Sequence, residues 1–101
     1  MISLKPGVKV SGIKPELVIA LHICESLWAS YHGQPLVVTS IKDGKHMVGS
    51  KHYDGLAADL RLPKDVDLPL LRNMLAAALG PEFDVVLEKS HIHLELDPKE
   101  T

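Results

Sequence analysis

The segment from His91 to Leu96 reads His-Ile-His-Leu-Glu-Leu and alternates with a period of two. Because residues two apart in a β-strand point to the same face of a sheet, this pattern predicts a strand with two unlike faces. Ile92 and Leu94 would share one face, and His91 and His93 would share the other. A core takes apolar side chains, so two imidazoles on one face need an explanation other than packing. The segment therefore predicts a sheet in which one face is apolar and the other carries chemistry.

Periodicity elsewhere predicts two helices and further strands. The first helix is expected from Pro15 to Tyr31, because proline suits the first turn and apolar residues then recur at helical spacing. Asp67 is expected to cap a second helix that ends at Leu79, before Gly80-Pro81. The expected strands are Val8 to Val10 (a short strand or an ordered arm), Leu36 to Ser40, Ala57 to Leu62, Phe83 to Leu87 and His91 to Leu96. This order predicts an α+β fold, with two helices packed on one face of a small, mostly antiparallel sheet.

Length and charge limit what the chain can be. A chain of 101 residues, 46% of them hydrophobic, predicts one domain over residues 1–101. A net charge of −2 and only four aromatic residues, none interleaved with basic ones, argue against a nucleic-acid partner. No stretch reaches membrane-spanning length, and the N-terminus lacks the apolar run of a signal peptide. We therefore expect a monomer that is made in the cytoplasm and does not bind a membrane.

Cysteine usage excludes two kinds of site. Cys24 is the only cysteine, so the chain can form neither an intrachain disulfide nor a thiolate zinc cluster. Its place among the apolar residues of the first helix predicts a small buried side chain.

Two short segments concentrate side chains that bind metals. The first runs from Ser50 to Leu60 and contains His52 and Asp59, while the second runs from Glu88 to Leu96 and contains the two histidines. A catalytic zinc site takes three ligands from His, Asp and Glu and leaves a fourth position for water. His52, Asp59 and one histidine of the second segment give that number. Calcium or magnesium fits less well, because hard cations prefer oxygen ligands.

Two further residues suit such a site. Gly55 lies between His52 and Asp59 and would let the chain turn sharply, so that both side chains converge. Glu88 lies just before the histidine strand, where a carboxylate could take a proton from water and hand it to a leaving amine. Together these residues would supply a Lewis acid, a nucleophile and a proton shuttle.

The motifs S-x-H-x-x-G-x-A-x-D, from Ser50 to Asp59, and E-x-x-H-x-H, from Glu88 to His93, resemble those of the M15-type zinc peptidases. That group includes D-alanyl-D-alanine peptidases and bacteriophage endolysins, and the same arrangement is similar to the zinc site of the hedgehog signalling domain. The resemblance spans residues 37–96, with its weight in the two motifs. It implies a hedgehog-like or D-Ala-D-Ala peptidase-like fold and bound Zn2+.

The resemblance also implies roles for single residues. His52 and Asp59 correspond to zinc ligands, and in most relatives with the H-x-H form the second histidine, here His93, is the third. His91 would then stabilise the oxyanion of the transition state. A subgroup with the E-x-x-H form places the ligand at His91 instead; the sequence fits both patterns, and we favour His93. Glu88 corresponds to the general base.

Substrate binding is implied less strongly. Ser50 matches a substrate-binding position of the relatives. Many of them carry an arginine after the Val-Thr-Ser strand, which holds a substrate carboxylate. Here the nearest basic residue is Lys42, and lysine lacks the bidentate fork of arginine.

The expected function is zinc-dependent hydrolysis of peptide bonds in the stem peptides of bacterial peptidoglycan, of the endolysin or the carboxypeptidase type. The small size and the missing signal peptide fit a phage-encoded enzyme that is released to act on the cell wall. The alternative is a non-catalytic, zinc-stabilised binding module of the hedgehog type. A fourth protein ligand would favour the module, whereas Glu88 favours the enzyme.

Three other polar residues are assigned ordinary roles. Glu95 shares the face of His93 and could hold a metal-binding residue from behind, but a solvated strand end is the commoner role for such a glutamate. His22 and His32, in and after the first helix, are expected to be exposed.

Overall fold

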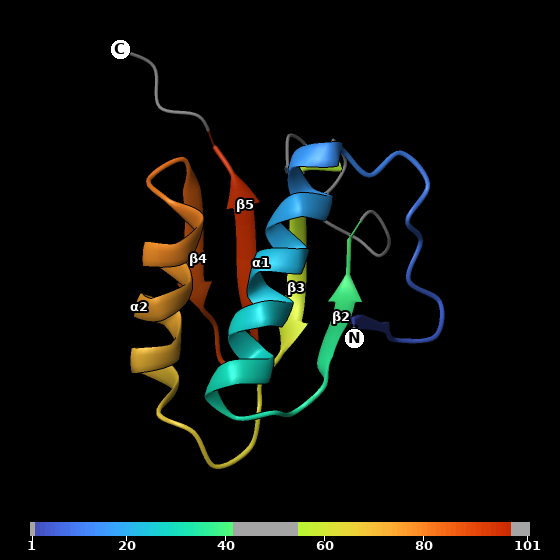
Figure 1. Ribbon diagram of the computed structural model, residues 1–101. Helices are drawn as coiled ribbons and strands as arrows, with labels where there is room; N and C mark the ends of the chain where they lie inside the picture. Colours follow the sequence, from blue (N-terminus) through green and yellow to red (C-terminus); the bar gives the residue numbers. More distant parts are fainter. Residues whose placement is uncertain (1, 42–54, 98–101) are drawn as a thin grey trace.

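The computed structural model describes residues 2–41 and 55–97. In chain order the elements are β1 (Ile2–Leu4), α1 (Pro15–Tyr31), β2 (Leu36–Ser40), β3 (Ala57–Arg61), α2 (Leu68–Leu79), β4 (Phe83–Leu87) and β5 (His91–Leu96). The five strands form one sheet in the order β1-β2-β3-β5-β4. Only β1 and β2 are parallel; the other neighbouring pairs are antiparallel. Both helices cover the same face of this sheet (Figure 1), which confirms the predicted α+β class.

Most predicted element bounds agree with the structure. α1, β2, β4 and β5 have the predicted bounds, and β3 ends one residue early, at Arg61. Asp67 caps α2 as expected, because its Oδ1 accepts a hydrogen bond from the Leu70 amide at 3.0 Å. Gly80 ends that helix with a φ of +92°. Neither helix in the described part of the chain is long and apolar enough to cross a membrane.

Of the two alternatives given for residues 8–10, a short strand or an ordered arm, the strand is wrong, and the first strand lies earlier in the chain. Residues 8–10 form no strand, whereas Ile2–Leu4 pairs in parallel with the start of β2. The Lys5 amide extends this pairing by donating to the Val38 carbonyl at 2.9 Å. Three residues are too few to show an alternation, and their partner lies more than 30 residues away, so no local signal marks this strand.

The core lies between the helices and the sheet. Fully buried members come from both helices and from three strands, β2, β3 and β5; among them are Leu17, Cys24, Trp28, Leu36, Val38, Ala58, Leu60, Leu71, Leu75, Ile92 and Leu94. Burying one such large apolar side chain stabilises the fold by about 1.5–3 kcal/mol. The prediction that Cys24 is buried is confirmed, and burial raises the pKa of its thiol to about 12.

The face of the sheet turned away from the helices we call the distal face. Strand alternation assigns residues to it, because their neighbours along each strand lie in the core. On β3 it carries Asp59, between the buried residues Ala58 and Leu60. The distal-face residues of β5 and β4 are His91, His93 and Glu95, and Asp84 and Val86.

Candidate metal centre

Asp59 and His93 stand directly opposite each other on β3 and β5. Opposed residues of an antiparallel pair bring their side chains together on one face. The Nδ1 atom of His93 lies 3.0 Å from Oδ1 of Asp59, although the two residues are 34 positions apart in the sequence. Only 14% of the Asp59 side chain and 21% of the His93 side chain are exposed. The pair therefore forms a partly desolvated centre on the distal face.

His91 approaches the same carboxylate from one step along β5. It is paired in register with Arg61, so it lies diagonal to Asp59. Its Nε2 atom is 3.6 Å from Oδ1 of Asp59, and 30% of its side chain is exposed. One carboxylate oxygen of Asp59 thus faces both imidazoles. The structure brings three of the predicted site residues together.

The second nitrogen of each imidazole also has a partner. Nδ1 of His91 lies 3.0 Å from Oγ of Ser90, and Nε2 of His93 lies 3.1 Å from Oε1 of Glu95. Histidine ligands of metals commonly have their far nitrogen held in this way, which fixes the orientation of the ring. The expectation that Glu95 is merely a solvated strand end was wrong, because its side chain is three-quarters buried against His93. The period of two in β5 had placed Glu95 on the face of His93, but it did not predict the burial of its side chain.

The strand next to β3 holds the Asp59 backbone from the other side. The register between β2 and β3 shifts between Val38 and Ser40, so that Ser40 is opposite Asp59. The hydroxyl of Thr39 donates to the Asp59 carbonyl at 3.3 Å. Such bulges re-aim side chains and recur next to active sites. Asp59 therefore sits on backbone that is fixed by both neighbouring strands.

The electrostatics of the centre favour a positive charge. The hydrogen bond to Asp59 raises the pKa of His93 to about 9; Glu95 adds to the rise, and partial burial opposes it. A bound divalent cation would likewise place positive charge beside the Asp59 carboxylate. Imidazole nitrogen with a carboxylate oxygen is also a donor set that zinc prefers. The described residues therefore fit two parts of a zinc ligand set, Asp59 and one of the two histidines.

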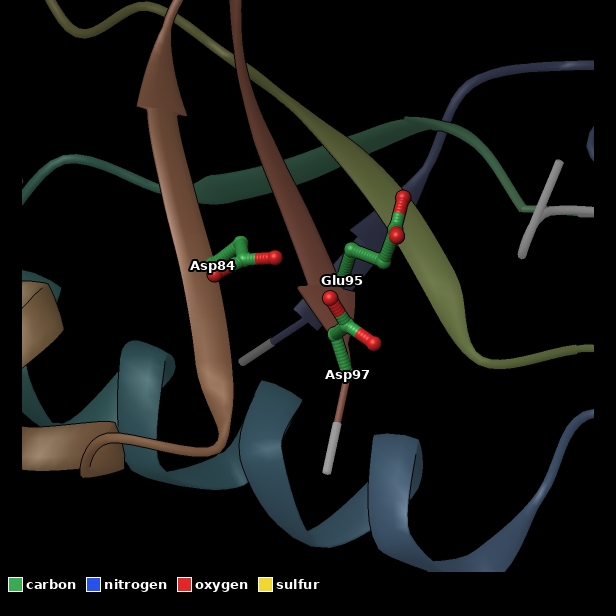
Figure 2. Close-up of side chains that lie close together, drawn as sticks. All are labelled: Asp84, Glu95 and Asp97. Atoms are coloured by element: carbon green, nitrogen blue, oxygen red, sulfur yellow. The ribbon is translucent and has the colours of Figure 1, made fainter. Parts of the chain in front are cut away.

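A second group of acidic side chains lies nearby. Figure 2 shows Asp84 on β4 and Glu95 and Asp97 at the end of β5. Among the described residues, this is the group of three whose ligand atoms all lie within 4.8 Å of one another. The ligand atoms of Asp59, His91 and His93 are farther apart than those of this acidic group. The acidic group has no imidazole and so differs from the predicted zinc site, and half-exposed acidic groups are common without a bound ion.

Glu88, the predicted general base, lies at the turn between β4 and β5. Its amide donates to the His91 carbonyl at 2.8 Å, which continues the β4–β5 register by one pair. Glu88 therefore stands opposite His91, and strand alternation directs both side chains to the distal face. Its side chain is exposed. The carboxylate is thus reachable by water beside one histidine of the centre.

Three predicted residues lie outside the described part of the chain. These are the ligand His52 and the two substrate-binding residues, Ser50 and Lys42. The structure resumes at Gly55, whose φ is +73°. A side chain there would also collide with the Gly12 carbonyl, while the Gly55 carbonyl accepts a hydrogen bond from the Lys14 amide at 3.1 Å. The backbone that leads into β3 therefore makes the turn that only glycine readily allows.

The histidines of the first helical region belong to a different part of the molecule. His22 is exposed on α1, as predicted. His32 was predicted to be exposed as well, but it is partly buried, with its ring edge-on to Trp28 at a centroid distance of 5.3 Å. Its Nδ1 accepts a hydrogen bond from the Gln34 amide at 3.1 Å. This contact helps to end the helix and has no part in the centre on the distal face.

Comparison with known proteins adds no assignment to this geometry. No protein-family model matches the chain. No curated protein matches it either.

Proposed function

We propose that the protein is a zinc-dependent peptidase that hydrolyses peptide bonds in the stem peptides of bacterial peptidoglycan. One observation carries the proposal: Asp59 meets both histidines of the H-x-H motif, with Oδ1 3.0 Å from His93 and 3.6 Å from His91. Such a meeting is what a shared metal site requires, and the two motifs had predicted it from distant parts of the sequence. The proposed ligands are His52, Asp59 and His93, with the fourth coordination position left to solvent.

A zinc ion in that place would acidify a water molecule and polarise the scissile carbonyl. Glu88 takes the proton from the attacking water and passes it to the departing amine. Its exposed side chain, at the turn after β4 and opposite His91, suits a group that must exchange protons with water and substrate. His91 donates a hydrogen bond to the oxygen on which negative charge develops. Its Nε2 atom points into the centre and its Nδ1 atom is held by Ser90.

Substrate recognition is assigned to residues of the first motif and of the segment before it. Ser50 is proposed to hydrogen-bond the peptide, and Lys42 to attract a substrate carboxylate as a point charge. A phage-encoded enzyme that reaches the wall on release is the setting that we propose.

The test is hydrolysis of purified cell walls, followed by the release of soluble peptides with new amino termini. The wild-type protein is assayed with bound zinc measured in parallel, with and without a chelator, beside Glu88→Gln. We expect the chelator to abolish release, because the ligand set would be empty. Glu88→Gln should reduce release by about 100- to 10,000-fold, the usual contribution of a general acid–base group, with its zinc content unchanged.

Glu82→Gln is the matched control, since it removes one exposed glutamate from the opposite end of β4 and should keep full activity. Release that survives both the chelator and Glu88→Gln would refute the zinc peptidase. A protein that binds one zinc ion tightly but releases nothing from any type of wall would instead support the non-catalytic module.

A further inference from the structure

The two histidines of the centre differ in what holds the ring from behind. Glu95 Oε1 lies 3.1 Å from Nε2 of His93, whereas Ser90 Oγ lies 3.0 Å from Nδ1 of His91. A carboxylate can only accept a hydrogen bond, so it requires a proton on the nitrogen that faces it. A hydroxyl can donate or accept, so it leaves the tautomer of its imidazole undetermined. His93 thus lies between two carboxylates, Asp59 and Glu95, and both of its nitrogens carry a proton in the metal-free protein, whereas the tautomer of His91 is undetermined.

The consequence for His93 is specific. A metal that binds Asp59 would replace the proton on Nδ1, the nitrogen that faces Asp59 at 3.0 Å, while Glu95 would keep the proton on Nε2; Nδ1 would then be the donor atom of His93. A carboxylate partner also makes the ring a more basic ligand than a hydroxyl does. His91 has neither advantage, and its Nε2 atom is farther from the Asp59 carboxylate, at 3.6 Å.

The surroundings of Glu95 favour this orientation of its carboxylate. It is paired with Asp84 on β4, and Asp97 follows two residues later; Figure 2 shows the three side chains close together. Repulsion among these carboxylates, whose oxygens lie within 4.8 Å of one another, is offset by the hydrogen bond that Glu95 Oε1 accepts from His93. On β3, Glu95 is paired with Ala57, whose small side chain leaves room for the Glu95 side chain to lie along the sheet toward His93.

We propose that Glu95 is the positioning residue of the metal centre: by holding Nε2 of His93, it presents Nδ1 to the metal and makes His93, rather than His91, the third ligand. This inference rests on the proposed zinc site and deepens it. It gives a physical reason for the preference for His93, where the sequence alone fits both ligand patterns.

The first test is zinc affinity, measured by competition with a chromophoric chelator. Glu95→Ala should bind zinc about 10- to 100-fold more weakly, the usual cost of losing the partner behind a ligand imidazole. Glu95→Gln should fall between wild type and Glu95→Ala, because its amide oxygen still accepts a hydrogen bond. Ser90→Ala and the charge-matched control Glu82→Gln should stay within about twofold of wild type. Thermal unfolding of each metal-free variant checks that the fold is retained.

The second test identifies the coordinating nitrogen from the ring ¹⁵N chemical shifts of histidine in the zinc-loaded protein. The expected result is zinc on Nδ1 of His93 and a retained proton on its Nε2. Zinc on Nε2 of His93, zinc on His91, or an unchanged affinity in folded Glu95→Ala would each overturn the inference. These results are separable from the fate of the peptidase: zinc binding with the expected nitrogen but no wall hydrolysis refutes the enzyme and supports the role of Glu95. A wild-type protein that binds no zinc refutes both.

Discussion

In β5, Ile92 and Leu94 are fully buried beneath the helices. The histidines that alternate with them are partly exposed: 30% of the His91 side chain and 21% of the His93 side chain. The same strand thus faces two environments, as Figure 1 illustrates with both helices on one side of the sheet. On the helix-covered face, cross-strand neighbours are apolar. On the distal face they are carboxylates and imidazoles, together with Ala57, Arg61 and Val86.

The comparison teaches how a small chain can hold a reactive centre. Apolar burial on one face supplies most of the stability, at about 25 cal/mol per Å² of apolar surface removed from water. The distal face contributes little of this and is therefore able to carry polar groups that a core would exclude. Substitutions on the two faces should differ accordingly, in stability on one and in metal binding on the other.

The largest effect is expected from Leu94→Ala. Leu94 is fully buried and is paired with Ala58 and Val85 on its two neighbouring strands. Removing its side chain leaves a cavity in the core and should lower the free energy of unfolding by about 2–5 kcal/mol, measured by urea denaturation. Val86→Ala is the control from the other face, where 43% of the residue is exposed, and it should cost less than about 1 kcal/mol. Equal losses in the two variants would contradict the division of the faces.

A smaller loss is expected from Gly55→Ala, at the entrance to β3. Alanine is disfavoured at a φ of +73°, and its Cβ would also collide with the Gly12 carbonyl. Gly33→Ala is the matched control, because Gly33 has the same φ of +73° but open space around it. Gly33→Ala should cost about 1 kcal/mol, from backbone strain alone, and Gly55→Ala about 2 kcal/mol or more. If the two variants unfold at the same denaturant concentration, the contact with Gly12 does not matter.

The smallest loss of stability is expected from His91→Ala. Its partner atom in Asp59 is 3.6 Å away and its own ring is 30% exposed, so the pair should contribute only about 0–1 kcal/mol. The metal-free variant should therefore unfold within about 0.5 kcal/mol of wild type. It should also keep its zinc affinity if His93 is the ligand, which titration with the metal measures directly. His22→Ala, exposed on α1, serves as the control for loss of a histidine. A loss of affinity as large as that of Asp59→Ala would reassign the third ligand to His91.

Much of the fold was predictable because its signals are local. Pro15 and Asp67 mark where the helices begin, and Gly80 marks where α2 ends, each through the backbone of its own neighbourhood. β1 was missed for the opposite reason, since its three residues are defined only by pairing with β2. The buried contact of Glu95 with His93 was missed because its burial depends on neighbours that the local pattern does not contain.

The sequence by itself determined which residues share a face, because the alternation of β5 is a property of extended backbone and needs no partner. It also limited the chemistry to the imidazoles and carboxylates of two motifs. The register between β3 and β5, which sets Asp59 against His93 rather than against Ile92, was decided only by the tertiary structure. A slip of one residue would turn one of these side chains to the other face. What holds the register is the burial of Ala58, Leu60, Ile92 and Leu94 under helices that are distant in the sequence.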